Sequence, residues 1–266
     1  MMLRPELDVS PAQWLAPRLS GRFGAVTRQV PAGYPAYARV FHPAHDEHGE
    51  PVSWAHVAEV TSRQVHPTMQ WHALIGSADS ANPASDLWPG DNPEIGNLAA
   101  QPLAALCDVL ARHTGTAETC WFCLWEGYGW IHGSPSVSIM YASTDPNEIT
   151  SSPAPVPPAL SQEQLDGPRV RHPHRDYFLF SGPLPAAVDM GWQVSPDWFD
   201  PQSPNLFWPE DRAWCVASEI DFDSTLVGGS TALVEALVAE PGLEVWPVEP
   251  DDSLAHDADK LNHPPS

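Results

Sequence analysis

Apolar positions along the chain form several strand-like runs and a few stretches with helical spacing. The clearest strand signal runs from Thr119 to Glu126, where aromatic and other apolar side chains follow one another. The leucines of 98–112 recur near the three- to four-residue spacing of a helix. Strands outnumber helices and do not alternate with them, so the pattern predicts an α+β fold. We expect a mixed or mostly antiparallel sheet, a few short helices and long Pro-rich loops.

Shorter patterns predict the remaining elements. Further strands are expected at 37–41, 137–141, 177–180, 213–220 and 243–248. Helices are expected at 11–20, opened by Ser10 and Pro11, at 53–60, capped by Ser53, and between Ser230 and Pro241. Runs rich in Pro, Gly, Ser and Asn predict loops at 76–97, 144–168 and 193–211.

Length and composition suit one large folded unit. The chain has 266 residues, 31 of them Pro and 12 of them Trp, which is rich in aromatics for a disordered chain. We predict a single α+β domain over 1–249, followed by an acidic, disordered tail over 250–266. The alternative is two lobes divided near 144–168.

The charge balance narrows the class of partner. Acidic side chains number 34 against 12 basic ones, giving a net charge of −22, and Lys260 is the single lysine. Such a field repels phosphate backbones, so direct nucleic-acid binding is not expected. A basic protein is the natural partner of an acidic surface, although the same charge also serves solubility alone.

The expected cellular compartment is inferred from membrane, secretion and disulfide signals. No run approaches the roughly 20 apolar residues of a membrane span, and the start of the chain carries no secretory signal. The four cysteines do not form a disulfide framework. We therefore expect a cytoplasmic protein with reduced thiols and no membrane partner.

A row of carboxylates is the first candidate site. Glu219, Asp221 and Asp223 occupy alternate positions, which places them on one face if the strand continues through them. Such a row can bind a divalent metal ion or supply an acid/base pair. It can equally be the solvent-facing side of an edge strand.

An aromatic turn is the second candidate site. Trp125, Glu126, Tyr128 and Trp130 are interleaved with glycines just after the strongest strand. Aromatic side chains on a turn can line a binding cleft, with Glu126 as a polar anchor. Packing into the core is the competing interpretation.

The chain has one cationic cluster, formed by Arg169, Arg171 and Arg175. Guanidinium groups bind phosphate or carboxylate ligands through paired hydrogen bonds. The alternative is that these arginines pair with the surrounding acids.

Two patterns that superficially suggest zinc do not hold up. The tract from His42 to Glu50 is rich in His and acids, but Pro43 and Gly49 mark a solvated loop. Cys120 and Cys123 stand three apart in a strand, so they point to opposite faces and cannot readily share one metal. We expect them to be buried as small apolar side chains.

Several segments carry a family resemblance: Gly33 to Pro43, Trp125 to Gly129, Tyr177 to Leu184 and Trp208 to Val216. Together they resemble a family of uncharacterised proteins from high-GC, actinobacterial-type bacteria, over about residues 30–250. That family has no assigned activity, so the resemblance implies no catalytic residue and no cofactor.

The leading functional hypothesis is a binding or interaction protein of the immunity or inhibitor type. It rests on the acidic charge, the aromatic turn and the lack of a nucleophile motif. The alternative is a metal-dependent hydrolase, or another small-molecule enzyme, that uses the carboxylate row. A mainly structural domain is a third interpretation. The sequence indicates no particular cofactor.

Overall fold

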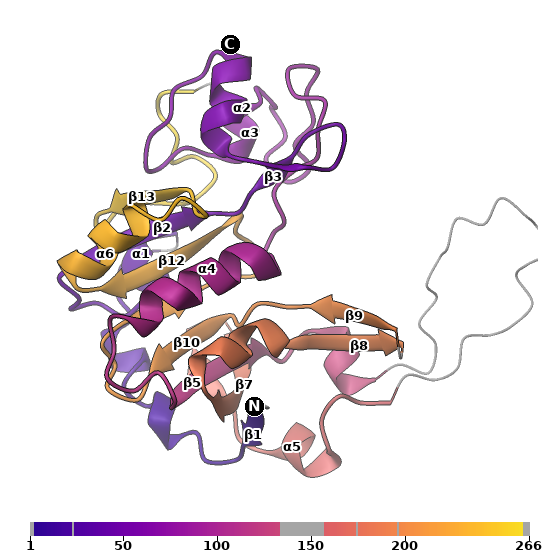
Figure 1. Ribbon diagram of the computed structural model, residues 1–266, viewed down its shortest axis with the longest axis vertical. Coiled ribbons are helices and arrows are strands. Elements are labelled where there is room, and N and C mark those ends of the chain that lie inside the picture. The colour runs from indigo at the N-terminus through magenta and orange to yellow at the C-terminus, as the bar shows by residue number, and fades with distance from the viewer. Residues whose placement is uncertain (1–2, 23, 134–156, 174, 196, 263–266) are drawn as a thin grey trace, which may run out of the picture.

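The computed structural model describes residues 3–22, 24–133, 157–173, 175–195 and 197–262, and its centre is a nine-stranded sheet (Figure 1). The strands follow the order β1 (Arg4–Glu6), β7 (Arg175–Gly182), β5 (Cys120–Trp125), β10 (Leu206–Pro209), β11 (Cys215–Ala217), β12 (Ser224–Gly229), β2 (Ala36–Phe41) and β13 (Val245–Val248), and β6 (Val170–His172) pairs with β7. Every strand pair among the described residues is antiparallel. The α+β prediction is confirmed.

One face of the sheet is covered by helices, as Figure 1 shows. These are α4 (Ala100–Ala111), α6 (Thr231–Val238) and the 3-10 helix η4 (Leu184–Asp189). Phe122 of β5 and Phe207 of β10 stack beneath them, with ring centroids 5.9 Å apart. The α6 helix begins as expected, because the Ser230 hydroxyl accepts the backbone N–H of Leu233 at 3.1 Å.

The N-terminal segment packs on the opposite face. It contains η1 (Ser10–Ala12), η2 (Ala16–Arg18) and α1 (Val26–Gln29), and Trp14 packs edge-on against Trp208 at 5.9 Å. The expected helix over 11–20 is therefore wrong. Pro17 interrupts it, because proline has no N–H to donate within a helix. Ser10 does not cap this segment, and its hydroxyl donates to Asp8 instead.

Cysteine placement follows the strand alternation. Cys120 belongs to the core under the helices and Cys123 to the core under the N-terminal segment. The two thiols thus lie on opposite faces of β5, as predicted. All four cysteines are buried and none forms a disulfide.

A separate small core, which we call the Trp lobe, lies beyond the edge of the sheet. It spans residues 44–97 and contains β3 (Ala44–His45), β4 (Pro51–Val52), α2 (Trp54–Thr61) and α3 (Trp71–Leu74). Trp54, Trp71 and Trp88 pack in a chain, with centroid distances of 5.3 and 6.5 Å. The predicted cap of α2 is confirmed, because Ser53 accepts the His56 N–H at 3.1 Å.

Two predicted loops contain regular structure. The 193–211 segment holds the end of β8 (Gly191–Ser195), all of β9 (Trp198–Pro201) and the central strand β10. The 144–168 segment holds α5 (Gln162–Asp166), which opens with a capping box between Ser161 and Gln164. The four residues of β10 and the five, mostly polar, residues of α5 are too few to show a period. The strand expected at 137–141 lies outside the described residues.

The sheet continues across the segment proposed as a lobe boundary. Strands β5 and β7 flank it in sequence and pair directly, from Cys120 opposite Gly182 to Trp125 opposite Tyr177. The segment 250–262, expected as a disordered tail, packs against the body instead. Leu254, Asp259 and Asn262 are all buried, so apolar and polar contacts both hold it.

Candidate functional site

The carboxylate row lies in a turn, not on a strand. Strand β11 ends at Ala217, and residues 218–223 turn back toward β12, with the Phe222 N–H donating to Glu219 O at 3.0 Å. The predicted strand 213–220 therefore runs three residues too far at its C-terminal end and starts two residues too early. The turn sends the three carboxylates in two directions, where a strand would have kept them on one face.

Glu219 and Asp221 meet the same arginine. Arg175 reaches Glu219 at 3.1 Å and Asp221 at 2.5 Å. Burial raises the pKa of Glu219, although the Arg175 guanidinium acts against that rise. The sequence analysis assigned Arg175 to a cationic cluster and these acids to a candidate metal site. In the structure, Arg175 and the two acids form ion pairs with each other.

Asp223 turns toward the Trp lobe and contacts Arg39. The Arg39 Nη2 lies 3.2 Å from Asp223 Oδ1, and their side chains are 1% and 22% exposed. Arg39 also donates to Ser224 Oγ at 2.8 Å and to Met69 O at 2.7 Å. Burial raises the pKa of Asp223 despite the opposing charge of Arg39.

Arg39 joins the sheet to the Trp lobe. It lies in the middle of β2, and its guanidinium carbon is 4.3 Å from the centroid of Phe41 and 5.5 Å from that of Trp54. Sequence reasoning missed this residue. The available signal was a lone arginine inside the apolar run Tyr37–Phe41, where an unpaired charge would be costly.

His42 is a structural residue rather than a metal ligand. Its ring is fully buried, with Nδ1 2.7 Å from Glu94 O and Nε2 2.9 Å from Thr225 Oγ1. Burial lowers the pKa of His42 to about 4. The neutral imidazole therefore pins the loop around Glu94 to strand β12. Among the described residues, no group of three or more His, Cys, Asp or Glu side chains could hold a metal ion.

A cavity of about 620 Å³ lies where the carboxylate turn meets the Trp lobe. Its lining comes from α3, from the loop over 80–95, from the turn at 221–223 and from the segment 254–256. Two of the three row carboxylates, Asp221 and Asp223, line it together with His72 and His256. No Lys or Arg lines it within the described part of the chain.

Specific contacts hold the walls of this cavity in place. Trp71 Nε1 donates to Asn92 Oδ1 at 2.7 Å, which fastens the loop to α3. The Gly96 N–H donates to Phe222 O at 2.8 Å, which fastens the loop to the turn. Gly96 has φ of +73°, and a Cβ there would stand 2.7 Å from the Ile220 carbonyl oxygen, so only glycine fits.

The lining combines negative charge with aromatic surface. Asp221 is exposed at 63% and Asp223 is more deeply set. Trp71 and Phe222 contribute rings. Burial lowers the pKa of His72, against the opposing effect of Asp223. The lowered pKa favours the uncharged form of His72.

The aromatic turn is packed, with its polar groups satisfied. Trp125 and Tyr128 pack edge-on at 5.3 Å, and Tyr128 stacks on Trp130 at 6.2 Å. Asn205 donates to the Tyr128 hydroxyl at 3.1 Å and accepts the Trp125 N–H at 2.8 Å. None of these aromatic residues lines the 620 Å³ cavity. The geometry therefore favours the packing interpretation of the turn.

The arginine cluster is used by internal partners. Arg169 bonds Glu126 at 3.0 Å and donates to the carbonyl of Leu165 at the end of α5. Arg171 pairs with Asp176 at the surface. Together with Arg175, all three predicted arginines are thus neutralised by acids. Glu126 is therefore an ion partner of Arg169.

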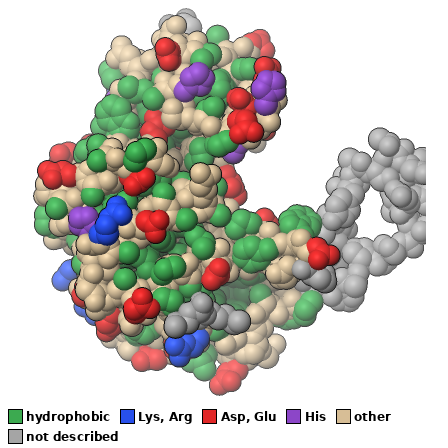
Figure 2. All heavy atoms as spheres, in the orientation of Figure 1, with side chains coloured by type: hydrophobic (Ala, Val, Ile, Leu, Met, Phe, Trp, Pro, Cys, Tyr) green, Lys and Arg blue, Asp and Glu red, His purple; other side chains and the backbone are tan. Residues whose placement is uncertain are grey.

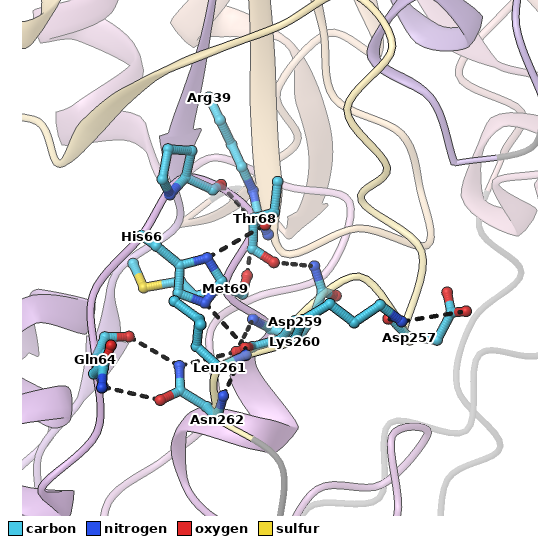
Figure 3. A network of polar contacts seen from close by, with 12 residues as sticks. Arg39, Gln64, His66, Thr68, Met69, Asp257, Asp259, Lys260, Leu261 and Asn262 are labelled. Carbon is cyan, nitrogen blue, oxygen red and sulfur yellow. Dashed lines mark hydrogen bonds and ion pairs between the residues drawn. The ribbon is translucent and has the colours of Figure 1, made fainter.

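A polar network ties the segment 257–262 to the Trp lobe (Figure 3). Asp259 lies 2.9 Å from His66 Nε2 and accepts the backbone N–H of Gln70 at 3.2 Å. The Asn262 amide bonds both backbone groups of Gln64, at 2.9 and 2.8 Å. This network, which we call the C-terminal latch, holds the chain that carries His256 at the rim of the cavity.

Fold and site together define an α+β protein with an acidic, partly aromatic cavity at the ends of strands β11 and β12. Compared with protein-family models, curated proteins and solved structures, the chain gives no match. The resemblance to a family from high-GC bacteria therefore stays a prediction. No helix among the described residues is long and apolar enough to cross a membrane.

Proposed function

We propose that the protein is a non-catalytic binding protein of the immunity or inhibitor type, and that its partner is a basic protein. The observation that carries this proposal is the excess of acidic side chains together with the pairing of several arginines within the chain. Arg39, Arg169, Arg171 and Arg175 all pair with internal carboxylates. Because each pair removes one charge of either sign, the net charge of −22 from 34 acidic and 12 basic side chains is unchanged by them.

The surface distribution supports the same proposal. Figure 2 shows acidic side chains spread over the visible face of the body and the Trp lobe, with basic ones at few places. A surface of one sign steers an oppositely charged partner and rejects partners of like charge. Four buried thiols without a disulfide support the cytoplasm as the place of binding.

Salt dependence tests the proposal. The probe is a fluorescein-labelled peptide of Lys, Gly and Ser with one central Arg, and its control carries Glu in place of each basic residue. Fluorescence anisotropy should show binding of the basic peptide alone. Affinity should fall steeply between about 0.1 M and about 1 M salt, where the screening length shrinks from about 10 Å to about 3 Å. Absent binding, or binding indifferent to salt, would refute charge-driven partnering.

A small-molecule enzyme is the second candidate, and one observation favours it. The cavity holds an uncharged His72 near Asp223, and a neutral imidazole can accept a proton. A metal-dependent enzyme has no support, because the described residues contain no group of three or more side chains that could hold a metal ion. Hydrolysis of nitrophenyl esters by the wild type that is lost in His72→Gln would support the enzyme hypothesis. Wild-type and variant rates that both equal the uncatalysed rate would refute it.

A further inference from the structure

We propose that the 620 Å³ cavity is the specific docking site of this protein for one arginine side chain of its basic partner. This inference rests on the proposed function and adds where the partner is recognised and by which chemical group. Three independent features carry it: the local charge, the shape and surface of the lining, and an open hydrogen-bond acceptor.

The carboxylates and guanidinium groups around the turn between β11 and β12 are unequal in number. Glu219 and Asp221 share the single guanidinium of Arg175, while Asp223 faces that of Arg39. Three carboxylates therefore meet two guanidinium groups, so the formal charges of this group leave one negative charge in excess. His72 does not compensate it, because burial lowers the pKa of His72 and keeps the ring neutral at pH 7. One added cation would complete the balance.

The lining suits a planar cation on a long apolar stem. Phe222 and the exposed Ile95 supply apolar surface to the lining, while Trp71 and Leu254 lie behind it almost fully buried. A guanidinium stacks on aromatic rings and gives up its hydration more easily than an ammonium group. A volume of about 620 Å³ also falls within the roughly 300–1,000 Å³ typical of ligand sites, which leaves room for the residues beside the arginine.

Gln70 provides an acceptor that the folded chain does not use. It is 6% exposed and lines the cavity. Its Nε2 donates to Thr68 O at 3.4 Å, while its Oε1 accepts no hydrogen bond from the described residues. This oxygen is not among the described buried atoms that lack a partner, so it is open to solvent, and an arginine N–H that enters the cavity takes the place of solvent as its donor.

Matched charge variants test the site. Asp221→Asn removes one negative charge at the mouth of the cavity, and Asp108→Asn removes one from the exposed side of α4, away from the cavity. Both keep the side-chain shape. With the Arg-centred peptide, Asp221→Asn should weaken binding by at least about fivefold and Asp108→Asn by less than about twofold. Gln70→Met, which removes the open acceptor without a charge, should also weaken binding, by about threefold or more.

Peptide variants separate guanidinium recognition from charge alone. Replacing the central Arg by Lys keeps the charge, and replacing it by citrulline keeps the shape. We expect the order Arg, then Lys, then citrulline for the wild type, and little difference among the three for Gln70→Met with Asp221→Asn. Agmatine, a free guanidinium, should compete only weakly, because it lacks the flanking peptide.

The outcomes distinguish the two levels of the proposal. Failure of the wild type to bind any basic peptide would overturn the proposed function. Equal losses in Asp221→Asn and Asp108→Asn, with salt-dependent binding intact, would overturn the cavity as the docking site and leave the proposed function standing. Agmatine that binds as tightly as the peptide would overturn the assignment to a partner's side chain. Circular dichroism confirms that each variant is folded before binding is compared.

Discussion

Replacing Arg39 by Met should destabilise the protein more than any surface substitution. The change keeps most of the apolar stem between Phe41 and Trp54 but removes the guanidinium. Asp223 then loses its ion partner, and the acceptors on Ser224 and Met69 lose their donors. Those groups cannot all be rehydrated, because Arg39 is 1% exposed in the folded protein.

The magnitude follows from the burial of the pair. Breaking a buried ion pair by removing one partner costs about 3–5 kcal/mol, chiefly through the charge left behind. Asp223 is 22% exposed, so partial solvation places the expected loss of unfolding free energy at the lower end of this range, about 3 kcal/mol. For a chain of this size that loss lowers the melting temperature by roughly 6–12 °C. It also removes a large part of the about 5–15 kcal/mol of typical total stability.

Urea unfolding followed by tryptophan fluorescence measures the effect. The midpoint should fall while the slope stays unchanged, because the folded core remains compact. Asp223→Asn and the double variant Arg39→Met with Asp223→Asn complete a thermodynamic cycle. The double variant should be more stable than the sum of the single losses predicts, because it leaves no buried charge without a partner.

Two results would refute this reasoning. A loss below about 1 kcal/mol for Arg39→Met would mean that water replaces the guanidinium freely. Strictly additive single losses would mean that Arg39 and Asp223 do not interact energetically. Either would also weaken the charge count on which the docking proposal depends.

Three further expectations concern other parts of the fold. Hydrogen bonds from Asn262 and neighbouring backbone groups outweigh the effect of burial and lower the pKa of Asp259. Its stabilising contribution is therefore present above about pH 4 and is lost as the pH falls through the folded pKa, and Asp259→Ala should flatten this acid dependence in thermal melts. Gly127→Ala should destabilise the protein by about 1–3 kcal/mol in urea, because a Cβ there would lie 2.1 Å from the Trp125 ring. Burial raises the pKa of Cys107 and of Cys120 to about 12, so Ellman's reagent at pH 8 should label neither thiol until the protein is unfolded. Rapid labelling of the native protein would contradict that expectation.

Local signals in the sequence were sufficient for the elements with their own caps or periodicity. Ser53 and Ser230 are N-caps that predict the starts of α2 and α6, and the apolar run of β5 predicts a strand. Strand β10 was not predictable, because its four residues are too few for a period and are bounded by prolines. Its place in the sheet comes from pairing on both sides, with β5 and β11, which no local pattern encodes.

The candidate site was predictable in part for a similar reason. The row of Glu219, Asp221 and Asp223 was visible as unusual chemistry. What neutralises it was not, because Arg39 and Asp223 stand 184 positions apart and Arg175 is 46 positions from Asp221. Long-range pairing decided that the row would bind arginines of its own chain.

The C-terminal latch sets an order of events during synthesis. His66 and Asp259 are 193 positions apart, so the Trp lobe leaves the ribosome long before the residues that close it. At about 5–20 residues per second, that interval lasts roughly 10–40 s. During this time the lobe lacks the groups that later cap Gln64, His66 and Gln70. A chain cut short before Asp259 never receives them, so its Trp lobe keeps Gln64, His66 and Gln70 without these partners.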